Sequence, residues 1–187
     1  MATKPHAPSR GIPTATNVDH IGWTVTDLDA AVRFCVDVLG GEEILRAGPF
    51  SDPAGDWMAT QFDVHPRAST TVAMVRMGPT QVIELLAWDT PDRPAGWPRT
   101  SDPGATHLAI HVRDVQAAMA YLVEHGCVAC GDPVLLSDVP QAGITIWYVR
   151  TPIGLYLELV SHPGHALPYE ESTVVRLLPN ATEWRND

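Results

Sequence analysis

The sequence contains few cysteines, few basic residues and no long apolar run. Three cysteines in 187 residues are too few for a disulfide scaffold, so Cys35, Cys127 and Cys130 are expected to be reduced thiols. Lys and Arg total 12 against 22 Asp and Glu, a net charge of -10 without any basic run, which argues against binding to nucleic acid or an anionic membrane. No segment approaches the roughly 20 apolar residues of a spanning helix, and the first residues lack the apolar region of a secretory signal. We therefore expect a cytoplasmic protein whose partner is a small-molecule substrate.

An internal repeat is the most informative feature that the sequence does contain. Residues 20–31, HIGWTVTDLDAA, align with residues 107–118, HLAIHVRDVQAA. In each copy an alternating segment precedes an Asp and then apolar residues at helical spacing, which is typical of a strand, an N-cap and a helix. Asp27 and Asp114 are the expected caps. The strands expected after the two helices are residues 43–47, 70–77 and 81–88 in the first half and 134–137, 145–150 and 154–160 in the second.

Each half is therefore predicted to fold as β-α-β-β-β, which gives an α+β class and one domain over residues 17–163. Module one spans 17–89, module two spans 105–163, and the Pro- and Gly-rich residues 90–104 connect them. Residues 1–16 show no periodicity and are predicted to be a disordered extension. The C-terminal extension, residues 164–187, contains an amphipathic patch around Val174 to Leu178 that could pack on the core or on a second subunit.

Strand alternation places one His and one Glu of each half on the face opposite the helices. These residues are His20 and Glu84 in the first half, and His107 and Glu158 in the second. Carboxylates that converge inside a sheet need a compensating cation or partner, and two imidazoles with two carboxylates suit a divalent metal. The matching positions therefore indicate a metal site, with ordinary polar residues at the rim of the sheet as the alternative.

The segments that carry these residues, DHIGWTVTDLDAAVRF, VIELL, ATHLAIHVRDVQAA and PIGLYLELV, resemble the vicinal oxygen chelate superfamily, which includes glyoxalase I and methylmalonyl-CoA epimerase. The resemblance covers about residues 17 to 162 and implies paired βαβββ modules that form a curved mixed sheet around a metal site, often in a homodimer. It implies one divalent ion (Ni, Co, Mn, Mg or Zn) held by His20, Glu84, His107 and Glu158. The ion would bind two neighbouring substrate oxygens and stabilise an enolate or ene-diolate, while Glu158 or Glu84 moves the proton.

Departures from glyoxalase I narrow the expected activity. Thr24 stands where glyoxalase I usually has an Arg, and residues 85–87 replace its usual Thr and Asn, so glutathione is not the expected substrate. We expect a metal-dependent isomerase, epimerase or lyase that acts on a small molecule with neighbouring oxygens. An extradiol-type dioxygenase with Fe(II) is the alternative. A non-catalytic, resistance-type binding protein is the second alternative.

Substrate contacts are expected mainly from a long insertion in the first half, residues 48–68, because long loops at the mouth of a concave sheet often contact ligands. His65 and Arg67 could bind a carboxylate or phosphate, and Trp57 with Met58 could form an apolar wall. The alternative is a surface loop with its own small cluster.

Two residues on the face of the presumed ligands, Thr24 and His111, are further substrate-binding candidates. His111 could also orient a ligand, act as an acid or base, or simply fill the interior of the sheet. Asp19 and Asp63 look like loop or cap residues, and no functional role is expected of them.

Overall fold

The first half of the chain folds into a four-stranded mixed sheet with one helix on one face. The structure is a computed structural model that describes residues 12–15, 17–94, 96–173 and 177. The first half comprises β1 (Ile21–Val25), α1 (Leu28–Arg33), the π-helix η1 (Phe34–Val38), β2 (Glu42–Ser51), α2 (Trp57–Phe62), β3 (Ser69–Met77) and β4 (Gln81–Asp89). Its strand order is β1-β4-β3-β2, with β1 parallel to β4.

The second half repeats this plan with a five-stranded sheet. It comprises β5 (His107–His111), α3 (Val115–Glu124), β6 (Val128–Ala129), β7 (Val134–Leu135), β8 (Thr145–Arg150) and β9 (Tyr156–Ser161), followed by the 3-10 helix η2 (Pro168–Glu171). The order is β5-β9-β8-β6, β7 pairs with β8, and β5 is parallel to β9. The α+β class and the repeated strand-helix-strand plan are therefore confirmed.

The helices begin where the sequence predicted. The side chain of Asp27 accepts a hydrogen bond from the N–H of Ala30, and that of Asp114 accepts from the N–H groups of Gln116 and Ala117. These bonds satisfy N–H groups that have no partner within their own helix.

The insertion of residues 48–68 is more ordered than expected, because β2 continues to Ser51 and a short helix, α2, follows. Its last turn ends at Asp63, whose left-handed conformation (φ 53°) confirms the cap interpretation of this residue. The short strand β6 is a further element that the sequence patterns did not predict.

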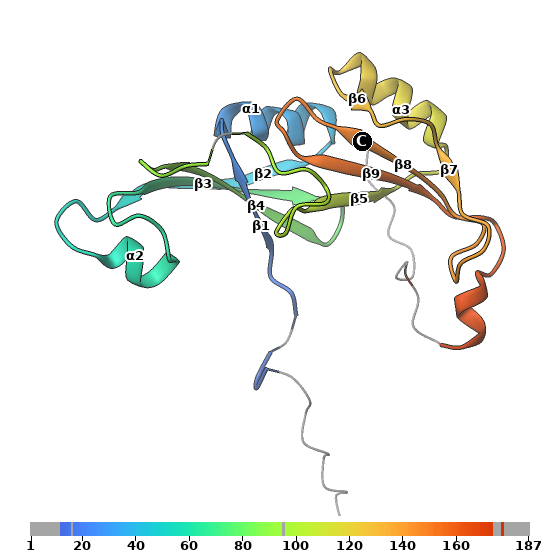
Figure 1. The fold of residues 1–187 in the computed structure, drawn as a ribbon, viewed down its shortest axis with the longest axis horizontal. Helices are drawn as coiled ribbons and strands as arrows, with labels where there is room; N and C mark the ends of the chain where they lie inside the picture. Colours follow the sequence, from blue (N-terminus) through green and yellow to red (C-terminus); the bar gives the residue numbers. More distant parts are fainter. Residues whose placement is uncertain (1–11, 16, 95, 174–176, 178–187) are drawn as a thin grey trace, which may run out of the picture.

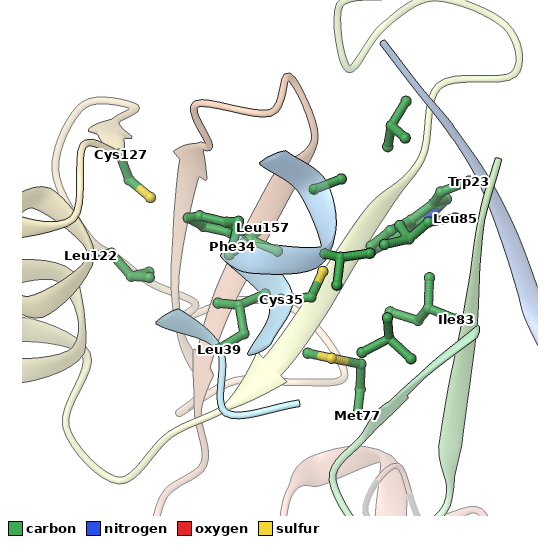
Figure 2. Packing of buried hydrophobic residues seen from close by; sticks show 14 of the residues in the cluster. Trp23, Phe34, Cys35, Leu39, Met77, Ile83, Leu85, Leu122, Cys127 and Leu157 are labelled. Atoms are coloured by element: carbon green, nitrogen blue, oxygen red, sulfur yellow. The ribbon is translucent and has the colours of Figure 1, made fainter. Parts of the chain in front are cut away.

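α1 and α3 lie on the same side of the two sheets, and among the described residues the opposite side carries only α2 at one end and η2 at the other (Figure 1). One apolar cluster under the helices joins the halves. In Figure 2, Phe34 and Leu39 of the first half face Leu122, Cys127 and Leu157 of the second. The hydroxyl of Tyr121 also donates to the carbonyl oxygen of Val38 across the same boundary.

The three cysteines are free, as expected, and two of them are buried. Burial raises the pKa of the Cys35 thiol to about 12 and that of Cys127 to about 11, because a thiolate is poorly solvated among apolar side chains. Cys130 is exposed.

Most of the expected disordered extension and most of the patch from residue 174 to residue 178 fall outside the described residues. In the described part of the chain, no helix has the length and apolar character needed to cross a membrane.

Candidate functional site

The first half-site joins the start of β1 to the middle of β4. Gly22 pairs with Glu84 in the parallel register, and the Nε2 atom of His20 lies 3.3 Å from Oε2 of Glu84. A Cβ atom at position 22 would lie 3.7 Å from the same carboxylate oxygen and 3.4 Å from Cδ1 of Leu86. The glycine therefore keeps the space beside the carboxylate open.

Asp19 orients the imidazole of His20, a role that the sequence interpretation did not assign to it. Its Oδ1 lies 2.7 Å from Nδ1 of His20, and this hydrogen bond raises the pKa of His20 above its ordinary value of 6.5, with a further contribution from Glu84. A carboxylate on one ring nitrogen fixes the tautomer and leaves the other nitrogen as an electron-pair donor, the arrangement common around metal-binding histidines. The acidic residue directly before the histidine in DHIG was the available signal.

The second half-site repeats the first on β5 and β9. Nε2 of His107 lies 3.1 Å from Oε2 of Glu158, whose side chain is only 14% exposed. The hydroxyl of Tyr148 on β8 lies 3.4 Å from the same histidine nitrogen, and Tyr148 pairs with Glu158 across the strands. Burial, followed by the charge and hydrogen bonding of Glu158, raises the pKa of Tyr148. Sequence analysis missed Tyr148, although its place on the strand next to Glu158 follows from the register.

The structure thus brings the four expected ligands together as two pairs. Within the described parts of the chain, no three His, Cys, Asp or Glu side chains lie close enough to hold a metal ion. His20 directly precedes β1 and His107 begins β5, and both are edge strands, because β1 pairs only with β4, and β5 only with β9, in the two described sheets. Each pair is therefore half of the ligand set that the sequence suggested.

The chemistry of the two pairs fits a divalent ion when they are combined. Each pair offers one imidazole nitrogen and one carboxylate oxygen about 3 Å apart, on a face without a covering helix. Two such pairs give two nitrogen and two oxygen donors with two negative charges. This ligand set suits Ni, Co, Mn or Zn better than it suits calcium, which prefers sites built from oxygen ligands alone.

Most of the side chains in residues 48–68 that were expected to contact a substrate instead contact other parts of the same segment. The guanidinium of Arg67 donates to the carbonyl oxygens of Pro53 and Gly55, and its backbone N–H donates to Nδ1 of His65. Met58 is fully buried. These contacts fit the alternative interpretation, a loop with its own cluster.

Trp57 belongs to a row of aromatic rings over one end of the first sheet. Its ring lies 5.1 Å from that of Phe62, which in turn lies 6.0 Å from the ring of Trp88 on β4. Figure 1 shows α2, which carries the first two rings, at the end of the molecule remote from α3.

The two remaining candidates, Thr24 and His111, occupy equivalent strand positions and are both exposed. They lie on the faces that carry Glu84 and Glu158, since Thr24 pairs with Leu86 and His111 pairs with Val160. His111 also contacts the ring of His162, at 5.2 Å between centroids.

Comparison with known proteins finds similarity over most of the chain. A sequence model of the Glyoxalase/Bleomycin resistance protein/Dioxygenase superfamily matches residues 19–148. A 2-epi-5-epi-valiolone epimerase from Actinomyces sp. is 44% identical over 176 residues, which are 94% of this chain and 94% of the relative.

Solved structures support the same fold at low sequence identity. A glyoxalase family protein from Bacillus cereus has a TM-score of 0.60 and 19% identity, covering 82% of this chain and all of that one. A glyoxylase/bleomycin resistance protein/dioxygenase domain from Frankia sp. EAN1pec has a TM-score of 0.56 and 20% identity, covering 81% of this chain and 96% of that one. The chain belongs to the glyoxalase/bleomycin resistance protein/dioxygenase superfamily.

Proposed function

We propose that this chain is a metal-dependent epimerase that inverts the carbon next to the ketone of a polyhydroxylated ring, with 2-epi-5-epi-valiolone or a near analogue as substrate. The observation that carries the proposal is the pair of equivalent His–Glu contacts, His20 with Glu84 and His107 with Glu158. The 44% identity to the Actinomyces epimerase over nearly the whole chain supports the choice of reaction and substrate.

The two carboxylates provide what an epimerase needs, a base on one side of the reacting carbon and an acid on the other. Glu84 and Glu158 come from equivalent strands of two different modules, so a substrate bound between the modules would have one carboxylate on each side. One carboxylate removes the α-proton from one face of the ring, and the other returns a proton to the opposite face. The net result is inversion at that carbon, without oxidation or reduction.

His20, Glu84, His107 and Glu158 would hold the divalent ion. When bound, such an ion supplies Lewis-acid stabilisation of the negative charge that develops on the ketone oxygen as the α-proton leaves. Asp19 holds His20 through Nδ1 and keeps Nε2 directed toward Glu84. In the second pair the hydroxyl of Tyr148 lies instead beside Nε2 of His107, the nitrogen that also faces Glu158.

A second copy of the chain is the partner that would bring the two half-sites together. β1 and β5 are edge strands of the two described sheets, and the apolar side chain of Ile21 on β1 is 46% exposed. Pairing of module one with module two of another copy would cover these edges. We therefore place the complete site in a homodimer, between modules of different chains.

The direct test is an NMR assay in D2O of the metal-loaded protein with 2-epi-5-epi-valiolone. We expect deuterium to enter at the carbon next to the ketone as the epimer forms, and we expect chelation to stop both processes. Glu84→Gln and Glu158→Gln should each abolish epimerisation, because one face of the ring loses its acid or base. The absence of exchange with Ni, Co, Mn, Mg or Zn would refute the function, and consumption of oxygen with Fe(II) would indicate a dioxygenase instead.

Mixing the two inactive variants tests the placement of the site between chains. After the subunits are allowed to exchange, each hybrid dimer holds one site with two intact modules, so about a quarter of wild-type activity should return. Hybrids stay inactive if each site lies within one chain, because every chain then carries a damaged site. Size-exclusion chromatography with light scattering supplies the control that the variants remain dimers.

A further inference from the structure

The second half-site carries a pair of histidines that the first half-site lacks. His111 ends β5 and His162 follows β9, and their rings meet edge to face, 5.2 Å apart with an interplanar angle of 84°. At the equivalent positions of the first module the chain has Thr24 and Trp88. At these positions the first half-site therefore carries a hydroxyl group and an indole, and the second carries two imidazoles.

His111 lies within reach of a substrate held at Glu158. Ala109 pairs with Glu158 and His111 pairs with Val160, so Glu158 and His111 share a face and are separated by two residues along the strands. That separation is about 7 Å, close to the width of a substituted six-membered ring. A ring with its reacting carbon at Glu158 would thus present its far side to His111.

His162 lies beside the ligand face and holds the ring of His111. The centroid contact is of the edge-to-face kind that aromatic rings favour, and His162 is half-buried at the end of β9. Burial, and then the proximity of His111, lower the pKa of His162, whereas Glu170 on η2 opposes this shift. The lowered pKa disfavours the protonated, anion-binding form of the His162 ring.

A neutral imidazole is suited to hydroxyl groups. It offers one N–H donor and one acceptor nitrogen, and a hydroxyl group can both donate and accept. Anion binding is disfavoured by the net charge of -10 and by the engagement of the Arg67 guanidinium with two carbonyl oxygens. The net charge of the chain and the engagement of Arg67 elsewhere therefore favour an uncharged, hydroxyl-bearing group over a phosphate.

We propose that the His111–His162 pair binds the hydroxyl groups on the far side of an uncharged polyhydroxylated ring, His111 by direct contact and His162 by positioning His111. This assignment rests on the proposed function and adds the determinant of its specificity. It distinguishes a polyol ketone from a simple hydroxyketone and from a phosphorylated sugar.

The test compares full-length, metal-loaded wild type with His111→Phe and His162→Phe, each of which retains an aromatic ring but removes the ring nitrogens. His125→Phe, on the helix side of the second module, is the matched control. The substrates are 2-epi-5-epi-valiolone, 2-hydroxycyclohexanone, which lacks the distal hydroxyl groups, and dihydroxyacetone phosphate. Proton exchange is followed by NMR, and binding of each compound is measured separately by calorimetry.

We expect His111→Phe to raise the KM for the polyol roughly three- to tenfold, the effect of one or two lost hydrogen bonds. The kcat should change little, and exchange on 2-hydroxycyclohexanone should stay at the wild-type rate. His162→Phe should raise the KM for the polyol by a smaller factor, with kcat again retained, because its ring still packs on His111.

Equal losses on the polyol and on 2-hydroxycyclohexanone would overturn the proposal, as would an unchanged KM or a wild-type preference for the phosphorylated ketone. Calorimetry separates this proposal from the proposed function. If the protein exchanges no proton but polyol binding weakens in His111→Phe, the epimerase function is refuted and the binding role of the histidine pair is retained. Exchange that is unaffected by either substitution would refute the pair and retain the epimerase.

Discussion

Replacing Glu158 with Gln separates the contribution of this carboxylate to metal binding from its contribution to folding. The substitution keeps the shape of the side chain and removes its charge. In the folded chain the carboxylate lies 3.1 Å from Nε2 of His107, and the side chain is 14% exposed. Gln can keep a hydrogen bond to the same imidazole. Without metal, the free energy of unfolding of the variant should therefore lie within about 1 kcal/mol of the wild-type value.

The effect on the metal-loaded protein should be much larger. A ligand that binds only the folded state at 100 times its Kd stabilises it by about 2.7 kcal/mol. For a chain of this size each kcal/mol shifts Tm by about 2–4 °C, so the wild type should gain roughly 5–11 °C. The variant has lost one of two charged ligands and should gain little at the same metal concentration.

Differential scanning fluorimetry with chelator and then with a Co2+ or Ni2+ titration measures both quantities. Glu124→Gln is the matched control, because this exposed carboxylate ends α3 on the helix side of the sheet. The control should gain as much from metal as the wild type does. Stabilisation of Glu158→Gln by metal to the wild-type extent would contradict a ligand role for Glu158, and a loss of several kcal/mol without metal would show that its carboxylate is needed for folding.

Three further predictions concern other parts of the fold. In the native protein only Cys130 should react quickly with a thiol reagent at pH 8, because burial raises the pKa of Cys35 and Cys127. All three cysteines should react after denaturation. Fast labelling of a second thiol in the native protein would contradict the burial. Asp114→Ala should lower the free energy of unfolding by about 1 kcal/mol, measured in urea, since two N–H groups lose their cap, whereas Asp114→Asn should lose less. Gly22→Val should weaken metal binding in calorimetry without loss of the folded circular dichroism spectrum, because a side chain at this position enters the space beside Glu84; unchanged affinity would place the ion elsewhere.

The repeat itself could be predicted from the sequence because both of its halves follow local rules. Asp27 and Asp114 cap their helices through side-chain bonds to nearby N–H groups, and strand alternation follows from the period of the backbone. The same alternation put His20 and Glu84 on one face, and the parallel register between β1 and β4 then brings them into contact. The helix caps and the contact between His20 and Glu84 could thus be predicted from local backbone geometry and the parallel pairing of the first and last strands of the module.

Features that depend on several elements at once could not be predicted. Tyr148 reaches His107 only because β8 pairs with β9 in one particular register. Val123 is apolar and follows the buried Leu122 in α3, yet it is 49% exposed, and helical spacing alone does not predict which apolar residues of a helix are covered. The use of Arg67 by two backbone carbonyls likewise depends on how residues 52–67 fold back on themselves.

The central claim is that the two half-sites act as a single metal site, and metal titration tests it most directly. Calorimetry with Co2+ or Ni2+ on the wild type should give one ion per chain. The affinity for the ion should fall at least tenfold in each single-residue variant, whichever module carries the substitution. The four variants are His20→Asn, Glu84→Gln, His107→Asn and Glu158→Gln. Two ions per chain, with each substitution affecting only the ion of its own module, would contradict the account.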